Sequence, residues 1–154
     1  INNWYQQLQE SGKFEIDEQT KAKINSLFVG EYATEEETKE TIKKVYDEHN
    51  YLLDTHTAVG LKSNLKAKSK LKDAEVTVID STANPYKFSR AVLEALTGEV
   101  DSTKDGFEVL EELKNLTGQE VHRGLQNLDK RELRHDRNCT SSNIKDEIKD
   151  ILDL

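Results

Sequence analysis

Residues 75–88 read Glu-Val-Thr-Val-Ile-Asp-Ser-Thr-Ala-Asn-Pro-Tyr-Lys-Phe, and this stretch decides the fold. Its first six residues are short of turn formers and rich in β-branched side chains, which predicts a strand at 75–80. The strand leads directly into Ser81 and Thr82. Pro85 suits the first turn of a helix, because the N–H that it lacks has no helical partner there. We therefore expect a strand, a short turn and a helix in this order.

Helix signals dominate the rest of the sequence. The clearest is Thr34-x-x-Glu37, a capping box in which each side chain bonds a backbone N–H of the first helical turn. With the single strand at 75–80, these signals predict a helix-rich α/β fragment with about six or seven helices. The expected helices cover 1–11, 17–28, 34–49, a lysine-rich stretch after residue 60, 85–96, 106–116, and a final helix that Ser141 or Ser142 caps and that carries Ile144, Ile148 and Ile151.

The composition indicates a chain that needs a partner. A lone strand leaves both of its edges unpaired, and a stable sheet generally has three or more strands, so we expect the partners of 75–80 to lie outside this chain. Apolar and charged residues each make up 34% of the sequence, which indicates a thin core. The chain begins at Ile1 and contains no Met. We expect that residues were trimmed from it or that a longer protein was cut.

The charge excludes some classes of partner. A net charge of −8 argues against nucleic-acid binding, which needs clustered basic residues. Five lysines at 62, 66, 68, 70 and 72 form a local exception, which we interpret as a solvated helix face without a site role. No apolar run approaches the roughly 20 residues that span a bilayer, and we expect no membrane contact. The single Cys139 and the lack of a signal peptide predict a cytoplasmic protein.

The sequence gives little support for a metal site or a reactive cysteine. The four His residues form no helical pair around a Glu, and one Cys cannot build a thiolate site, so we predict no metal ligands. His135 and Cys139 lie four positions apart in a polar stretch, and we interpret this as incidental. We interpret His49 as a packed residue at the edge of its helix rather than as a ligand.

A ligand site is better indicated where the predicted strand ends. In α/β sheets, ligands bind beyond the carboxyl ends of strands, where helix N-termini offer unpaired N–H groups. Ser81 and Thr82 stand at such a point. They can also serve as caps of the helix that starts at Pro85, and the local pattern favours the cap. Both interpretations stay open on the residues alone.

Two motifs in fixed order give a family resemblance. Residues 54–60 read Asp-Thr-His-Thr-Ala-Val-Gly, and about two dozen positions later Ser-Thr-Ala-Asn-Pro-Tyr-Lys-Phe follows the predicted strand. The pair resembles the signature of the yeast and bacterial branch of threonine synthases, which are fold type II enzymes that use pyridoxal 5'-phosphate (PLP). Residues 110–135 resemble the last segment of that family. The resemblance covers nearly the whole chain.

The resemblance implies an activity and site residues. Threonine synthases are carbon–oxygen lyases that convert O-phospho-L-homoserine and water to L-threonine and phosphate. By resemblance, Thr82, with Ser81 as the fallback, bonds the pyridine nitrogen of PLP. The resemblance offers His56 and Thr57 for the substrate, although His56 suits a structural role at a helix start equally well. Lys87 is a further candidate for a phosphate group.

The resemblance also implies that half of the active site is missing. The lysine that binds PLP and the Gly-rich phosphate loop belong to the N-terminal half of the family, and this chain has neither. We therefore expect no catalytic residue here, an inactive isolated chain, and a separate N-terminal PLP-lysine portion as partner. We divide the C-terminal fragment 1–154 into a helical part, 1–50, and a part bearing both motifs, 51–154. The alternative is a non-catalytic, acidic helical interaction module derived from the family.

Overall fold

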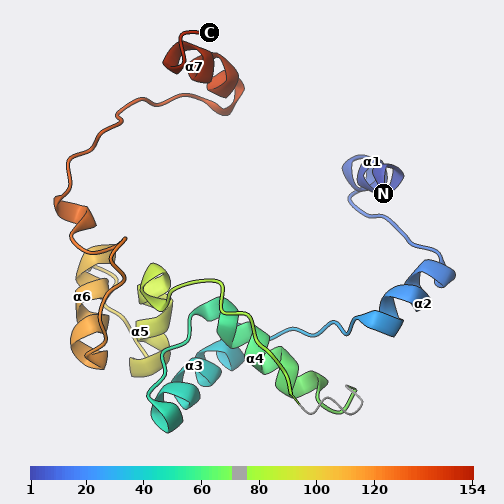
Figure 1. The fold of residues 1–154 in the computed structure, drawn as a ribbon, viewed down its shortest axis with the longest axis horizontal. Helices are drawn as coiled ribbons and strands as arrows, with labels where there is room; N and C mark the ends of the chain where they lie inside the picture. The colour runs from blue at the N-terminus through green and yellow to red at the C-terminus, as the bar shows by residue number, and fades with distance from the viewer. Residues whose placement is uncertain (71–75) are drawn as a thin grey trace. The chain divides into compact units, whose positions relative to one another are not determined.

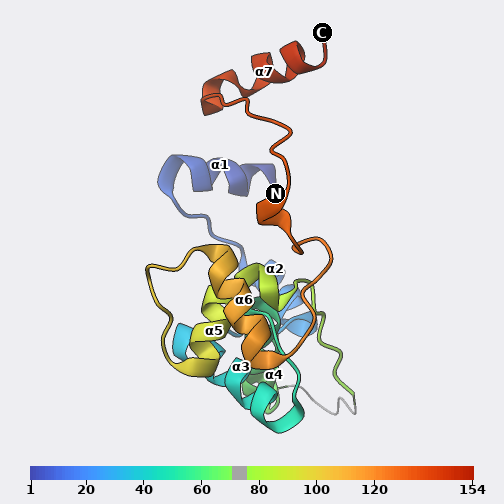
Figure 2. The same cartoon turned by 90° about the vertical axis from the view of Figure 1, so that its left-hand side faces the viewer.

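The structure, a computed structural model, describes residues 1–70 and 76–154. It forms two compact units, Ile1–His122 and Arg123–Leu154. The described ranges contain seven α-helices and three short 3-10 helices, which confirms the helix-rich fold (Figures 1 and 2). Their bounds are α1 Asn2–Ser11, α2 Glu18–Leu27, α3 Glu35–His49, α4 Thr55–Ala67, η1 Pro85–Phe88, α5 Ser89–Thr97, α6 Gly106–Thr117, η2 Leu128–Lys130, η3 Ser141–Asn143 and α7 Ile144–Ile151.

Four helices make the core of the first unit. Helix α3 contacts both α4 and α5, and α5 contacts α6, so the four stack in a continuous series (Figure 1). Their inward faces carry apolar side chains at helical spacing, which water cannot reach. The fully or almost fully buried members are Ile42, Ala58, Val92, Leu93, Val109 and Leu113.

The helix ends follow the sequence signals. At the start of α3, the Glu37 amide donates to the Thr34 hydroxyl at 3.2 Å, and the Thr34 amide donates to the Glu37 carboxylate at 2.9 Å. The predicted capping box is therefore confirmed. Gly98 and Gly118 end α5 and α6 in the left-handed conformation, with φ of 91° and 66°. A side chain at either position would strain this backbone.

Ion pairs fasten α3 to its two neighbours. Lys39 of α3 lies 2.8 Å from Glu94 of α5, and Lys66 of α4 lies 2.6 Å from Glu37 of α3. The hydrogen bond from Lys66 is the main cause that lowers the pKa of Glu37. The hydrogen bond from Lys39 to Glu94 is the main cause that raises the pKa of Lys39. Lys62 and Lys70 of the basic stretch also face carboxylates, those of Glu37 and Glu31. These lysines therefore pair with carboxylates rather than forming an open basic patch.

The predicted strand is wrong. Glu75 lies outside the described residues, and residues 76–80 have no regular secondary structure. No strand occurs anywhere in the ranges 1–70 and 76–154. Val76 and Val78 are 80% and 83% exposed. A β-branched run becomes a strand only when a neighbouring segment supplies backbone hydrogen bonds, and no described segment does so here. Only Ile79 packs inward, where a methyl lies 3.5 Å from the position that a Cβ would take at Gly60 of α4.

Two further predictions about side chains are wrong. Neither Ser141 nor Ser142 caps α7: they lie in η3, and the N-cap is Asn143, without a side-chain hydrogen bond. His49 is not packed, because its side chain is 67% exposed and lies 3.8 Å from Glu48. Helices α1, α2 and α7 bury no residue at all. Within the part of the chain that the structure describes, each helix is too short or too polar to span a membrane.

Candidate functional site

Asp54 organises the first motif. It is the N-cap of α4, and its side chain is fully buried. One carboxylate oxygen accepts from the amides of His56 and Thr57, at 2.9 and 3.2 Å, and the other accepts from the Thr57 hydroxyl. An aspartate suits this position because the first N–H groups of a helix have no partner within the helix. The motif 54–60 is therefore the beginning of α4 itself, whereas the sequence predicted that this helix starts only after residue 60.

Thr57 connects the first motif to the second. Its side chain is buried, and its hydroxyl oxygen lies 3.2 Å from the hydroxyl oxygen of Ser81. Ser81 and Thr57 are 24 positions apart in the chain. The structure thus brings together two of the predicted site residues, one from each motif, at the first turn of α4.

Ser81 and Thr82 themselves are exposed. Neither caps the helix at Pro85, because the Asn84 side chain accepts the Tyr86 amide at 3.0 Å and holds that position. The local preference for a cap was therefore wrong. Within the described ranges, the Thr82 hydroxyl makes no hydrogen bond. A ligand can use it without breaking an internal contact.

His56 borders a pocket between α3, α4 and α5. Its ring is 64% exposed and lies 4.8 Å from the Phe88 ring, centroid to centroid, at a tilt of 52°. Its Nδ1 is 3.5 Å from the Asp54 carboxylate. The pocket has a volume of about 430 Å³ and is lined by side chains of α3, α4 and α5 and of the segments before α3 and α5: Ala33, Glu35, Thr38, Thr55, His56, Val59, Phe88 and Ala91.

Lys87 lies apart from the hydroxyl pair and the pocket lining. It is the third residue of η1, its side chain is exposed, and its Nζ lies 5.7 Å from the centre of the Phe88 ring. No carboxylate in the described residues pairs with it. This cation is consequently available to an anionic group, but the structure joins it to His56 only through their shared neighbour Phe88.

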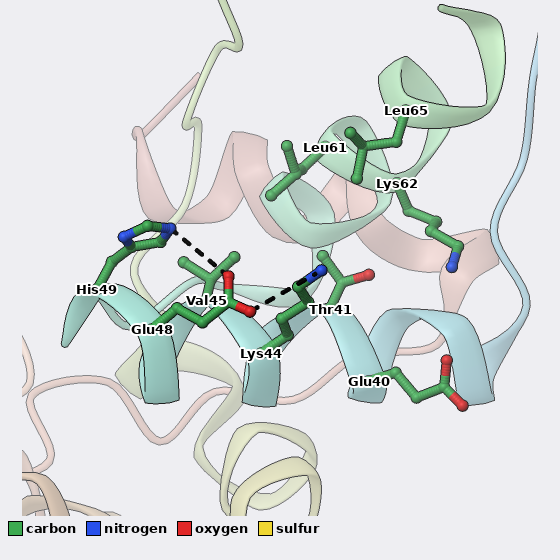
Figure 3. A pocket seen from close by; sticks show the side chains of 9 residues that line it. All are labelled: Glu40, Thr41, Lys44, Val45, Glu48, His49, Leu61, Lys62 and Leu65. Carbon is green, nitrogen blue, oxygen red and sulfur yellow. Dashed lines mark ion pairs between the residues drawn. The ribbon is translucent and has the colours of Figure 1, made fainter.

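A second pocket, of about 470 Å³, lies between α3 and α4 and holds none of the predicted site residues. Figure 3 shows Leu61 and Leu65 on α4 above a row of α3 side chains, where Glu48 pairs with both His49 and Lys44. The nearest nitrogen–oxygen distances are 3.8 and 3.9 Å. This pocket is therefore separate from the candidate site that the two motifs form.

Sequence reasoning missed three residues of this region. Asp54 and Asn84 are caps, and the signal was present: each is an Asp or Asn directly before a helical segment. Tyr86 is buried and donates from its hydroxyl to the Gln119 carbonyl at 2.7 Å, which ties η1 to the end of α6. No local pattern could reveal that contact, because its partner lies 33 positions away.

Comparisons with known proteins agree with the two motifs. The family described as "Threonine synthase, C-terminal" matches residues 57–137. The threonine synthase of Saccharomyces cerevisiae is 38% identical over 122 residues, which are 76% of this chain and 24% of that protein. A crystal structure of threonine synthase from yeast matches with a TM-score of 0.57 and 36% identity, over 74% of this chain and 24% of that one.

A second solved structure, the PLP-bound threonine synthase from Brucella melitensis, matches with a TM-score of 0.56 and 31% identity. The match covers 76% of this chain and 27% of that one. This chain thus spans about a quarter of the length of these relatives. The predicted resemblance is confirmed, and the family match covers residues 57–60 of the first motif and the whole of the second. The chain belongs to the threonine synthase family, of which it represents a C-terminal portion.

Proposed function

We propose that this chain is the C-terminal part of a PLP-dependent enzyme that converts O-phospho-L-homoserine and water to L-threonine and phosphate. The observation that carries this proposal is the contact between Thr57 and Ser81, which joins the two family motifs in one place. The family match over residues 57–137 gives that contact its chemical meaning. The division into parts 1–50 and 51–154 and the cytoplasmic location belong to the same proposal.

The hydroxyls at Ser81 and Thr82 fit one side of a PLP site. Both side chains are exposed, and within residues 1–70 and 76–154 nothing bonds the Thr82 hydroxyl. A hydroxyl can donate to the ring nitrogen of the cofactor without adding a charge beside it. PLP itself supplies the electron sink for the loss of phosphate and the addition of water. Thr82, with Ser81 as the fallback, would hold the ring in one orientation.

Three further residues serve the substrate in this proposal. His56 is exposed at the edge of the pocket and can donate to or accept from a polar group. Lys87 presents a cation without a carboxylate partner in the described residues, which suits the phosphate of the substrate. Thr57 is buried and its hydroxyl bonds the Asp54 carboxylate, so it would support the site from below rather than contact the substrate through an exposed side chain.

The lysine that binds PLP and the phosphate loop lie, in this proposal, on an N-terminal portion that acts as partner. Sequencing the coding region upstream of Ile1 tests this directly. A reading frame that supplies a Lys-Asp site and a Gly-rich loop supports the proposal. A stop codon just before Ile1 favours the non-catalytic interaction module instead.

The cofactor role of Thr82 can be tested in the longer protein by Thr82→Val, which keeps the volume and removes the hydroxyl. We expect the dissociation constant for PLP to rise about tenfold, the loss of roughly one hydrogen bond, with an unchanged far-ultraviolet circular dichroism spectrum. Thr77→Val is the matched control, because Thr77 is exposed in the same segment. Equal PLP affinity in wild type and Thr82→Val would remove Thr82 from the site.

A further inference from the structure

Phe88 stands where the two family motifs meet. It belongs to the second motif, ends η1 and is the N-cap of α5. Its side chain is half-buried and lines the pocket that His56 of the first motif borders. In the described residues, its ring contacts both His56 and its own neighbour Lys87. These two side chains are exposed, and an exposed group binds a ligand well only when its direction is fixed.

The His56 ring is held at two places. Its Nδ1 lies 3.5 Å from the Asp54 carboxylate and 3.4 Å from the Thr55 hydroxyl. These contacts fix one atom, about which an exposed ring can still swing. The Phe88 ring lies 4.8 Å away, centroid to centroid, at a tilt of 52°, which is within the range where aromatic rings attract one another. Nε2, which no residue in the ranges 1–70 and 76–154 bonds, is the nitrogen left for a ligand.

Lys87 depends on the same ring. Its side chain is exposed, and no carboxylate in the described part of the chain pairs with it. Its Nζ lies 5.7 Å from the centre of the Phe88 ring, a distance at which the negative face of an aromatic ring attracts a cation. A lysine stem is flexible, so this contact narrows the positions of the ammonium group. The ring takes up none of the N–H donors in a conventional hydrogen bond, so they stay available to an anion.

We propose that Phe88 is a positioning residue for the substrate: through one ring it sets the direction of the His56 imidazole and the place of the Lys87 ammonium, so that both serve one bound molecule. The roles of His56 and Lys87 toward O-phospho-L-homoserine rest on the proposed function. The ring contacts themselves are a property of this chain. The two polar groups come from different motifs, and among the described residues Phe88 is the neighbour that they share.

The positioning of His56 can be measured on the 154-residue chain by NMR, without cofactor or substrate. The coupling constants between the Hα and Hβ protons of His56 report whether its side chain keeps one rotamer. We expect single-rotamer values in the wild type and averaged values in Phe88→Leu, which keeps an apolar side chain but removes the ring. Phe88→Tyr keeps the ring and should restore the single rotamer.

Phe107→Leu on α6 is the matched control, because Phe107 is 38% exposed and does not line the pocket. It should leave the His56 couplings as they are in the wild type. Averaged couplings already in the wild type, or unchanged couplings in Phe88→Leu, would overturn the inference.

The contact with Lys87 has its own signal. The ring current of Phe88 shifts protons above the ring face upfield, and the ε-methylene protons of Lys87 are bonded to the carbon that carries Nζ. We expect them upfield of those of Lys23, an exposed lysine of α2, and we expect Phe88→Leu to remove this difference. Identical ε-proton shifts in the wild type and Phe88→Leu would contradict the role of Phe88 toward Lys87.

In the longer protein, the same variants have a kinetic readout. A residue that only directs substrate-binding groups affects the bound substrate and the transition state alike, which changes KM and not kcat. For Phe88→Leu we expect KM for O-phospho-L-homoserine to rise about tenfold, the equivalent of roughly one hydrogen bond, with kcat within about twofold of wild type. Phe88→Tyr and Phe107→Leu should stay near wild type. An unchanged KM in Phe88→Leu would overturn the inference.

This inference and the proposed function can fail separately. A longer protein that does not turn over O-phospho-L-homoserine contradicts the proposed function, while the His56 couplings still decide whether Phe88 positions that ring. A longer protein that is active, with a KM insensitive to Phe88→Leu, keeps the proposed function and overturns this inference.

Discussion

Helices α3 to α6 and helices α1, α2 and α7 all carry apolar residues on one face, yet only the first group buries side chains. Helix α7 repeats Ile144, Ile148 and Ile151 on one face, as regularly as any core helix, and all three remain about half exposed. Ile42 of α3 is completely buried. Periodicity thus predicts that a helix forms and which face is apolar, but it cannot say whether this chain supplies the surface that covers it.

The comparison is tested most directly by the same substitution, isoleucine to alanine, in a helix of each group. Ile42→Ala removes a fully buried side chain, and we expect a loss of about 2 to 5 kcal/mol in the free energy of unfolding. Ile148→Ala removes a half-exposed one, and we expect a change within about 0.5 kcal/mol. Urea unfolding followed by circular dichroism measures both. Equal losses would show that α7 is covered in solution.

A smaller effect is expected from a polar contact of the core. Tyr86→Phe removes the hydroxyl that donates to the Gln119 carbonyl at 2.7 Å and also contacts the Thr117 hydroxyl at 3.1 Å, which should cost about 1 to 2 kcal/mol. Tyr5→Phe on α1 is the matched control, because Tyr5 is 64% exposed. The same unfolding experiment reports both variants. If Tyr5→Phe costs as much as Tyr86→Phe, the hydroxyl does not tie η1 to α6.

The smallest effect concerns the ion pair between α3 and α4 and depends on pH. Because Lys66 lowers the pKa of Glu37 below its ordinary 4.5, the pair stabilises the fold above that pH, and this contribution fades as the pH falls through the lower, folded pKa. Glu37→Gln should therefore have a lower melting temperature than wild type at pH 7, and the difference should shrink below pH 4.5. Glu40→Gln, on the exposed side of α3, is the control.

A melting-temperature difference that stays constant from pH 7 to pH 3 would contradict this account. It would mean that the loss does not come from the charge of Glu37, because the effect of that charge must fade once the carboxylate is protonated.

The fold was predictable wherever the signal is local. Thr34 with Glu37, and Gly98 and Gly118, mark helix ends that the structure confirms, because a cap depends on residues a few positions away. The strand at 75–80 failed for the opposite reason. A strand is stable only through bonds to another segment, and β-branched composition carries no information about whether that segment is present.

The candidate site was predictable as two motifs but not as a geometry. The sequence offered Thr57 and Ser81 separately, and their contact depends on how α4 and the segment before η1 pack. Their roles, and those of Thr82, His56 and Lys87, stay predictions. The burial of Asp54 could not be predicted, because it depends on how the start of α4 packs and not on the neighbouring sequence.

The pair between Lys39 and Glu94 joins residues 55 positions apart, while α3 with α4 and α5 with α6 are neighbours in the chain. The contacts of α3 with α4 and of α5 with α6 can therefore form quickly during folding. The docking of α5 on α3 is slower, because the chain between these two helices must first bring them together. The closure entropy grows only with the logarithm of loop length, by about 0.6 kcal/mol for each doubling. A longer connection between α4 and α5 should therefore slow folding only slightly.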